Sequence, residues 1–337
     1  MRARLGSLLA LALAGALPAA GLSAEEAFVP ELALPIACAV GQTCHIQNHV
    51  DLDPGPDARD FTCGTMTYEG HDGVDFRLPD LAAMRAGVDV LAAAPGRVRG
   101  VRDGMPDRSV RETGRQAVAK RECGNGVVVA HSDGWETQYC HLGQGSIRVA
   151  RGERVEAGTV LGRVGVSGLS EYPHLHFSVR RRGAAVDPFA FERDPESCGS
   201  GRPLWAPAIR ASLAYRTPVV LNAGFSDGAV DAGELESGAI AERRIGPDPP
   251  ALVAYVRGIV LKAGDVQRLA LLGPGGDTIS QNVARPLERA RAQHMMFTGK
   301  RRPAAGWPPG VYTGVYTVER EGAVVLRNEV RLEIPAP

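Results

Sequence analysis

Short segments in which apolar and polar residues alternate, separated by turns rich in glycine and proline, make up most of this chain from about residue 71 onward. Alternation with a period of two is typical of strands that bury one face. The clearest case is a hairpin, in which residues 126–131 and 135–141 are strands and Ser132-Asp133-Gly134 is the tight turn between them. Glycines spaced through residues 152–162 fit sharply bent strands of a compact sandwich. The same pattern predicts further strands at 88–94, 97–102 and 174–180.

The C-terminal part of the chain shows the same alternation of apolar and polar residues. Its candidate strands, again joined by glycine and proline turns, are 252–261, 267–272, 294–298, 310–320 and 324–334. Roughly 110–130 residues with such a pattern predict an immunoglobulin-like sandwich. Helical periodicity occurs only briefly, near 287–292. We therefore expect an all-β protein, with one compact antiparallel sandwich followed by a second, immunoglobulin-like one.

The first two dozen residues differ in kind. Arg2 and Arg4 precede an apolar run from Leu8 to Leu17, and small residues follow as far as Ala24. A basic start, a short apolar segment and a small-residue exit predict a secretory signal peptide at 1–24. The run is too short for a comfortable membrane span, so an uncleaved anchor is the weaker interpretation. No cysteine precedes residue 38, which excludes a lipid-modified cysteine at the cleavage point.

Composition narrows the function classes. The formal charge is zero, with 38 basic and 38 acidic residues, so a nucleic-acid partner gains no support.

Residues 25–69 contain the run Asp53-Pro54-Gly55-Pro56-Asp57, which predicts an irregular but ordered arm. In this arm His45 and His49 are expected on the surface or in local hydrogen bonds rather than on a metal.

Six cysteines in an exported chain predict disulfides, although six cysteines allow 15 pairings. Cys123 and Cys140 flank the predicted hairpin, and Cys44 and Cys63 bracket one loop, so these are the two preferred pairs. A structural zinc site built from Cys38, Cys44, His45 and His49 is a competing hypothesis, but its spacing matches no common ligand pattern.

Candidate chemistry gathers in two segments about a hundred residues apart. His174 and His176 lie two residues apart in a predicted strand, so both imidazoles project from one face. Upstream, Gly73 argues against a helix, and in extended chain His71 and Asp75 also share a face. Two imidazoles and a carboxylate around one point, with a fourth position open, describe a catalytic zinc site.

The segment from about Gly70 to Pro188 resembles the lysostaphin-like (LytM-type) zinc metallopeptidases. It carries HDGVD at 71–75, YCHL at 139–142 and HLHF at 174–177, and its glycine-valine spacer at 152–162 also matches. The resemblance covers about a third of the chain. One departure is Val166-Ser167-Gly168, where many relatives have Asn-Thr-Gly or Ser-Thr-Gly; it bears on substrate preference and not on the metal.

The resemblance implies the roles of five residues. The zinc ligands are His71, Asp75 and His176, and the catalytic residues His141 and His174 stand beside the metal-bound water. It also implies a small antiparallel β-sandwich with a narrow groove. The domains expected are a signal peptide at 1–24, a disulfide-tied arm at 25–69, a zinc metallopeptidase domain at 70–198 and a C-terminal β-sandwich domain at 205–337.

The function implied is that of a secreted endopeptidase with one Zn²⁺ per chain, which hydrolyses peptide bonds in peptidoglycan stems or cross-bridges with zinc-bound water as nucleophile. The leader favours the periplasm over an extracellular location, without stable membrane insertion after cleavage. The alternative is a non-catalytic envelope protein of the same fold that binds wall peptides or activates another wall hydrolase. A biotinyl or lipoyl carrier is set aside because no lysine lies between Glu122 and Leu261.

Three further segments keep two interpretations each. The charged insertion at 103–122 is either a surface loop or a wall beside the substrate groove. Arg180-Arg181-Arg182 is either a solvated strand end or a cationic patch for the carboxylates of wall peptides. The C-terminal domain shows no catalytic constellation, and it is a candidate surface for positioning substrate or binding an envelope protein partner.

Overall fold

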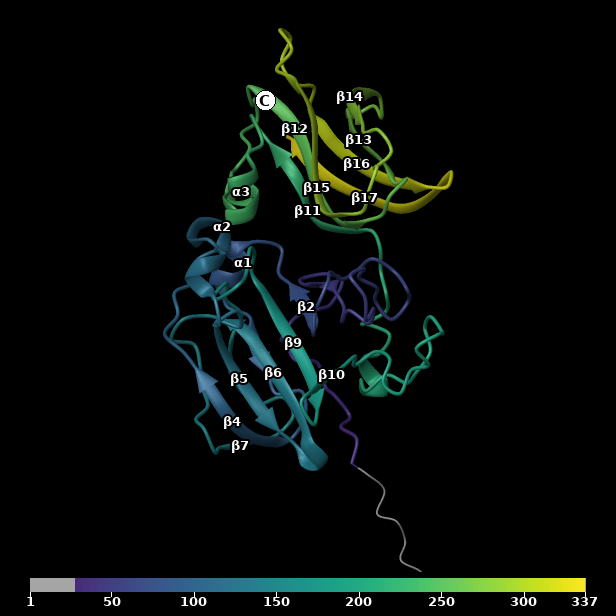
Figure 1. Ribbon diagram of the computed structural model, residues 1–337. Coiled ribbons are helices and arrows are strands. Elements are labelled where there is room, and N and C mark those ends of the chain that lie inside the picture. The colour runs from purple at the N-terminus through teal and green to yellow at the C-terminus, as the bar shows by residue number, and fades with distance from the viewer. Residues whose placement is uncertain (1–27, 337) are drawn as a thin grey trace, which may run out of the picture.

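Antiparallel strands account for most of the secondary structure in the computed structural model, which describes residues 28–336 (Figure 1). The expected signal peptide at 1–24 lies outside these residues. Within them, no helix combines the length and the apolar composition needed to cross a bilayer. The prediction of an all-β fold class is confirmed.

The larger sheet of the first unit has the strand order β1-β2-β9-β6-β5-β4-β7, and β10 pairs with the end of β9. The bounds of these strands are β1 His45–Asn48, β2 Val74–Arg77, β4 Gly96–Arg102, β5 Asn125–Ala130, β6 Trp135–Leu142, β7 Arg154–Val155, β9 His174–Arg181 and β10 Ala184–Val186. A two-stranded sheet, β3 (Asp89–Leu91) with β8 (Val160–Arg163), shares its core. Side chains from both sheets, among them Val90, Leu161, Val127 and Phe177, are fully buried there.

The arm before residue 70 is part of this unit. Leu32 and Ile36 are fully buried in its core, and β1 adds a strand to the sheet by pairing with β2, His45 opposite Arg77. Downstream, Trp205 also packs into this core, and its neighbour Ala206 donates a backbone hydrogen bond to Leu32. The expected domain boundaries at 69–70 and 198–205 stay predictions.

Short helical segments occur at the edges of the strands. They are α1 Leu81–Ala86, α2 Val110–Thr113, η1 Arg115–Val118, η2 Ser132–Gly134, η3 Pro207–Ile209, α3 Ala232–Ser237 and α4 Ala239–Glu242. The predicted hairpin is observed, with η2 as its turn. The helical periodicity near 287–292 was a wrong indication, because residues 284–290 are irregular and Arg291 already begins a strand.

The C-terminal strands form two sheets around a common core. One has the order β11-β12-β15 and the other β14-β13-β16-β17. Their bounds are β11 Val219–Ser226, β12 Ala251–Leu261, β13 Val266–Leu272, β14 Thr278–Val283, β15 Arg291–Arg301, β16 Gly310–Arg320 and β17 Ala323–Ile334. A second two-sheet unit is therefore present, whereas its immunoglobulin-like character stays a prediction.

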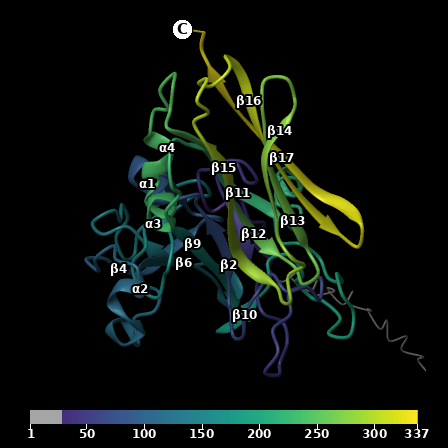
Figure 2. The same cartoon turned by 90° about the horizontal axis from the view of Figure 1, so that it is seen from above.

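The two units meet near β2. Arg77 of β2 is buried and donates a hydrogen bond of 2.8 Å to the side-chain oxygen of Gln293 in β15. Arg257 of β12, also buried, donates to the carbonyl of Pro79 and pairs with Glu236. Helices α1 and α3 also contact each other and lie side by side in both views (Figure 2). The C-terminal unit thus packs against the strand that carries Asp75.

Three disulfides are formed: Cys38–Cys44, Cys63–Cys198 and Cys123–Cys140. The predicted pair Cys123–Cys140 is confirmed, and the pair Cys44–Cys63 is wrong because Cys63 reaches across 135 residues to Cys198. The structural zinc hypothesis is also wrong, since Cys38 and Cys44 are bonded to each other and offer no thiolate. The wrong pair was chosen because Cys44 and Cys63 are close in sequence, whereas the fold brings Cys198 next to Cys63 in the arm.

Asp187 follows the last strand of the first unit, and its buried carboxyl is expected to make the stability of the protein depend on pH. The residue is 3% exposed; Oδ1 accepts the Phe189 N–H at 2.8 Å, and Oδ2 has no partner among the described residues. Burial raises the pKa of this carboxyl to about 7. The folded protein therefore holds a proton here that the unfolded chain loses near pH 4, so this group's contribution to stability falls as pH rises from about 4 to about 7.

We expect Asp187→Asn to flatten that dependence, because the amide stays neutral and keeps an oxygen for the Phe189 N–H. Relative to the parent, the variant should gain roughly 2–4 kcal/mol of unfolding free energy between pH 4 and pH 8. Urea denaturation at several pH values measures this difference, with exposed Asp57→Asn as the control. Parallel pH profiles for Asp187→Asn and the parent would show that this carboxyl does not titrate in that window.

Candidate metal centre

The strand pairing of β2 with β9 brings the two predicted segments together. Asp75 lies directly opposite His176 in the register, and Phe76 lies opposite Leu175. His71 precedes β2 in the same segment and is 3% exposed. Gly73 permits the close approach, since a Cβ there would lie 2.7 Å from the His176 ring and 2.8 Å from the Phe177 carbonyl oxygen. The HDGVD segment therefore needs its glycine to reach the HLHF strand.

Three donor atoms converge at this point. His71 Nε2 lies 3.2 Å from Asp75 Oδ1 and 3.1 Å from His176 Nδ1, and His176 Nδ1 lies 3.0 Å from Asp75 Oδ1. Across the described residues, this is the one group of three or more histidine, cysteine or carboxylate side chains with metal-binding spacing. The three side chains are those that the sequence predicts as ligands, and the structure places them together.

The second polar atom of each of these three side chains forms a hydrogen bond with a neighbouring group. His71 Nδ1 donates to the His49 carbonyl at 2.7 Å, and His176 Nε2 donates to Asp72 Oδ1 at 3.1 Å. Asp75 Oδ2 accepts from Asn48 Nδ2 at 2.8 Å. Because a neutral imidazole carries one N–H, these partners assign the lone pairs of His71 Nε2 and His176 Nδ1 to the centre. With both imidazoles neutral, two nitrogen lone pairs and a carboxylate oxygen thus face one another.

Such a set fits a zinc ion. Donor atoms around a tetrahedral zinc with bonds of 2.0–2.1 Å lie about 3.3 Å apart, close to the separations of 3.0–3.2 Å found here. The remote imidazole nitrogens bonded to a carbonyl and a carboxylate are the outer contacts typical of zinc-bound histidines. The site also favours positive charge: burial lowers the pKa of His176, but Asp72 and Asp75 outweigh it and raise this pKa to about 9.

His141 and His174 stand beside the three donor atoms. Their rings lie 4.6 Å apart, and His174 Nε2 is 3.5 Å from Asp75 Oδ1. His141 Nδ1 donates to the Ser167 carbonyl at 2.8 Å and His174 Nδ1 to the Tyr172 carbonyl at 2.9 Å. Both therefore keep an unprotonated Nε2. Burial lowers the pKa of His141 well below its usual value and also lowers that of His174, so both are neutral near pH 7.

A groove of about 330 Å³ gives access to this centre. Both His71 and His176 line it, together with Tyr68, a residue that is 54% exposed and whose ring lies 4.5 Å from the His71 ring. On another wall, Arg180 pairs with Asp72 at 2.7 Å and with Gln138. Since Arg180 is already paired with the carboxylate that holds His176, its first role is structural, and the cationic-patch interpretation gains nothing from it.

The charged insertion packs against the loop before β9. The Val110 N–H donates to the Ser170 carbonyl at 2.8 Å, and the Arg111 guanidinium forms two hydrogen bonds with the Glu171 carboxylate. Ser170 in turn contacts His174 Nδ1 at 3.2 Å. The insertion thus packs against the segment that holds a predicted catalytic histidine, and Glu122 at its end lines the groove, whereas residues 103–121 do not.

Sequence reasoning missed several residues of this site. Asn48 and the carbonyl of His49 come from the arm, and Asp72 comes from within the HDGVD motif. His45 and His49 lie off the metal centre as expected, but both are buried rather than on the surface. The ring of His49 packs among Phe61, Phe189 and Tyr215. The sequence carried no signal for these residues, because the burial of the polar strand His45–Asn48 is seen only in the structure.

We expect Asp72→Asn to weaken zinc binding, because an amide is a poorer acceptor for the His176 Nε2–H and no longer fixes that tautomer. Loss of such an outer contact typically costs 10–100-fold in metal affinity. Competition with a chromogenic chelator measures the change. Glu122→Gln, which removes an exposed carboxylate of the same groove that does not contact His176, is the control. Equal zinc affinities for the parent and Asp72→Asn would contradict the assignment.

Residues 69–188 match the model of peptidase family M23. DD-carboxypeptidase/endopeptidase Mpg of Neisseria meningitidis serogroup B is 33% identical over 36% of this chain and 23% of its own length. Cell division protein DipM of Caulobacter vibrioides is 31% identical over 34% of this chain and 15% of its own. Peptidoglycan DD-endopeptidase ShyB of Vibrio cholerae is 30% identical over 35% of this chain and 22% of its own. The chain thus aligns with less than a quarter of the length of these relatives.

Proposed function

We propose that this protein is a zinc-dependent endopeptidase that hydrolyses peptide bonds of peptidoglycan, since residues 69–188 match the model of peptidase family M23. The observation that carries the proposal is the convergence of three lone pairs, from His71 Nε2, His176 Nδ1 and Asp75 Oδ1, within 3.2 Å of one another. Unless a metal cation or a proton lies between them, these atoms would repel one another. The names of two relatives, Mpg and ShyB, support an endopeptidase, and that of ShyB supports peptidoglycan as substrate.

One zinc ion per chain would be held by His71, Asp75 and His176, and would supply Lewis acidity that polarises the scissile carbonyl and lowers the pKa of a water molecule. Proton transfer is the task of the chain's own histidines. The Nε2 atoms of His141 and His174 are unprotonated and aim at the centre, so either can accept a proton from the attacking water. The resulting imidazolium can hydrogen-bond to the developing oxyanion and return the proton to the leaving amine.

The five side chains hold fixed orientations before any substrate arrives. Each of the four histidines donates one ring N–H to a backbone carbonyl or to Asp72, and Asp75 accepts from Asn48. Groups oriented in advance cost less reorganisation during the reaction. The set is complete, which gives no support to the alternative of a non-catalytic wall-binding protein or activator.

We also propose that the protein acts outside the cytoplasm, in the periplasm or at the wall. The three disulfides among the described residues suit an oxidising compartment, and the N-terminal sequence predicts export. Fractionation of cells that produce the full chain tests this directly, and recovery of the protein with its leader intact in the cytoplasm would contradict it.

The proposed activity is tested by incubating the purified protein with purified peptidoglycan, with and without a chelator, and weighing the released fragments by mass spectrometry. We expect peptide fragments that end at one kind of bond, their loss with the chelator and their return on adding zinc. The mass of the fragments identifies the bond. Intact peptidoglycan after incubation with a fully zinc-loaded protein would contradict the proposal and return the non-catalytic alternative to consideration.

A further inference from the structure

His141 lies in an irregularity of the sheet. Between β5 and β6, Asn125 faces Leu142 and Val127 faces Tyr139. On β5 only Gly126 stands between the two pairs, whereas on β6 both Cys140 and His141 do. This is a β-bulge, in which one strand carries an extra residue and the side chains beyond it change direction. The bulge sits at the residue that must aim an imidazole at the metal centre.

The backbone of His141 has an uncommon conformation. Its φ is +62°, in the left-handed region that residues other than glycine seldom occupy. Such a conformation persists only where the surroundings enforce it. Here the His141 N–H donates to the Cys123 carbonyl at 2.8 Å, and its carbonyl accepts from the Gly165 N–H at 2.9 Å. With the bond from Nδ1 to the Ser167 carbonyl, every polar group of His141 except Nε2 is anchored.

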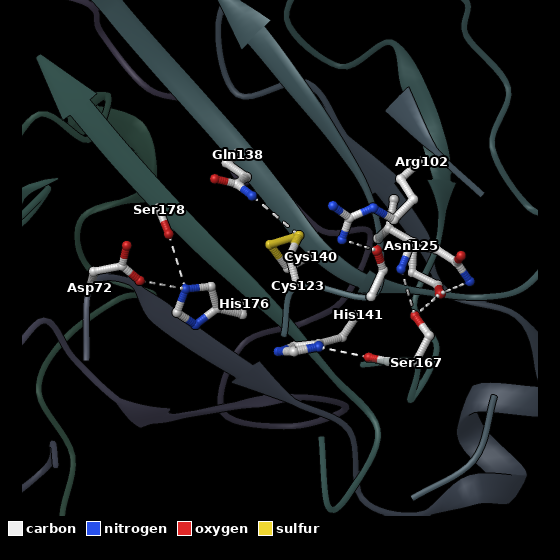
Figure 3. Close-up of a disulfide and its surroundings, with 12 residues drawn as sticks. Asp72, Arg102, Cys123, Asn125, Gln138, Cys140, His141, Ser167, His176 and Ser178 are labelled. Carbon is white, nitrogen blue, oxygen red and sulfur yellow. Dashed lines mark hydrogen bonds and ion pairs between the residues drawn. A yellow bond between two sulfur atoms is a disulfide. The ribbon is translucent and has the colours of Figure 1, made fainter. Parts of the chain in front are cut away.

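Cys123 holds both residues of the bulge. Its sulfur is bonded to Cys140, and its carbonyl accepts the N–H of His141, as Figure 3 shows for the disulfide beside the His141 and His176 rings. Gly126, opposite the bulge, leaves room for this bond, because a Cβ there would lie 2.9 Å from Cys123 Sγ and 2.6 Å from the Tyr139 carbonyl oxygen. In the neighbouring pairing Cys140 faces His176. The disulfide therefore sits between the strand of a metal ligand and a catalytic histidine.

We propose that the Cys123–Cys140 disulfide is a positioning element for His141: it fixes the bulge that turns the imidazole toward the metal centre. Cys123 and Cys140 line the groove beside the centre, but neither is one of the three donor residues, and the proposed effect on turnover acts through His141. The two other disulfides join the arm to itself and to residue 198, and neither contains a residue adjacent to a member of the centre. The role in turnover rests on the proposed function, whereas the placement of the imidazole does not.

The test is the double variant Cys123→Ala/Cys140→Ala, with Cys38→Ala/Cys44→Ala as its matched control. We expect the first to keep its zinc and its KM for a soluble peptide substrate, with kcat lower by about 10²-fold, the cost of misplacing a catalytic group by about 1 Å. The control should keep both constants. In a His141→Ala background, removal of the disulfide should change kcat no further. An unchanged kcat, or an equal loss in that background, would overturn the proposal.

A second readout does not depend on activity. The His141 Nδ1–H that donates to Ser167 should give a slowly exchanging imidazole signal in the NMR spectrum of the zinc-loaded parent. We expect it to exchange at least about tenfold faster without the disulfide and unchanged in the Cys38→Ala/Cys44→Ala control. Equal exchange rates would overturn the proposal. If the parent does not hydrolyse peptidoglycan, the proposed function fails and this measurement alone decides the inference.

A further variant covers the case in which the double variant does not fold. With Cys38, Cys44, Cys63 and Cys198 replaced by alanine, Cys123–Cys140 is the remaining disulfide, and the folded protein can be reduced with a dithiol. The bond takes up two electrons and two protons to give two thiols, while the reagent becomes a cyclic disulfide. We expect the slow imidazole exchange and the turnover to be lost together on reduction and recovered together on reoxidation. Full activity in the reduced state would contradict the proposal.

Discussion

Replacing Asp75 by asparagine is expected to remove zinc binding and hydrolysis together. The carboxylate is the anionic member of the donor set, and Oδ1 lies 3.2 Å from His71 Nε2 and 3.0 Å from His176 Nδ1. Asparagine has nearly the same shape and can still accept from Asn48, so the fold should persist. Because the metal supplies the main electrostatic stabilisation in the proposed reaction, we expect the loss in kcat to reach at least about 10³-fold.

Metal analysis after dialysis against a zinc buffer, combined with peptidoglycan hydrolysis, measures both effects. The control is Asp57→Asn, an exposed carboxylate in the arm, which should leave both unchanged. An Asp75→Asn variant that binds one zinc ion per chain and still releases peptides would show that the ligand assignment is wrong. A variant that loses zinc but stays active would instead remove the metal from the mechanism.

The second large effect is expected for His141→Ala and His174→Ala, which should separate zinc binding from turnover. Neither side chain is needed to complete the three-donor set, so each variant should keep its zinc. Each removes an Nε2 that can move a proton, a contribution typically worth 10²–10⁴-fold in rate. If both act in the same step, the double variant should lose little more than the more damaging single one.

Steady-state kinetics on a soluble peptide, with zinc content measured on the same samples, tests this separation. His294→Ala, which changes the histidine of the C-terminal unit, is the control and should match the parent. Turnover by both single variants at the parent's rate would remove the catalytic assignment. Loss of zinc in either variant would make that residue a ligand rather than a proton carrier.

Strand periodicity predicted only part of the ligand set. It placed His174 and His176 on one face of a strand, and His71 and Asp75 on one face of the upstream segment. The choice of His71, Asp75 and His176 as ligands, with His174 beside them, followed from the resemblance to the lysostaphin-like metallopeptidases. The hairpin carrying His141 was predictable from its alternating residues and its Asp-Gly turn. What the periodicity could not supply was the bulge that aims His141, since it arises from a one-residue difference between β5 and β6 and not from either strand alone.

The pattern of apolar and polar residues could not predict contacts between residues that are far apart in the sequence. The arm strand His45–Asn48 has no alternation of apolar and polar residues, because all four side chains are buried, and its Asn48 and His49 hold two ligands in place. Cys63–Cys198 was missed because nothing near either cysteine marks the return of the chain. The false helix near 287–292 arose from a short run of apolar residues at helical spacing that overlaps the first residues of β15.

A crystal structure with anomalous scattering measured on both sides of the zinc absorption edge tests the central claim most directly. We expect one zinc peak per chain, at about 2.0–2.2 Å from His71 Nε2, Asp75 Oδ1 and His176 Nδ1, with the Nε2 atoms of His141 and His174 facing its remaining position. A zinc peak held by other side chains, or none in protein grown with zinc, would contradict the account.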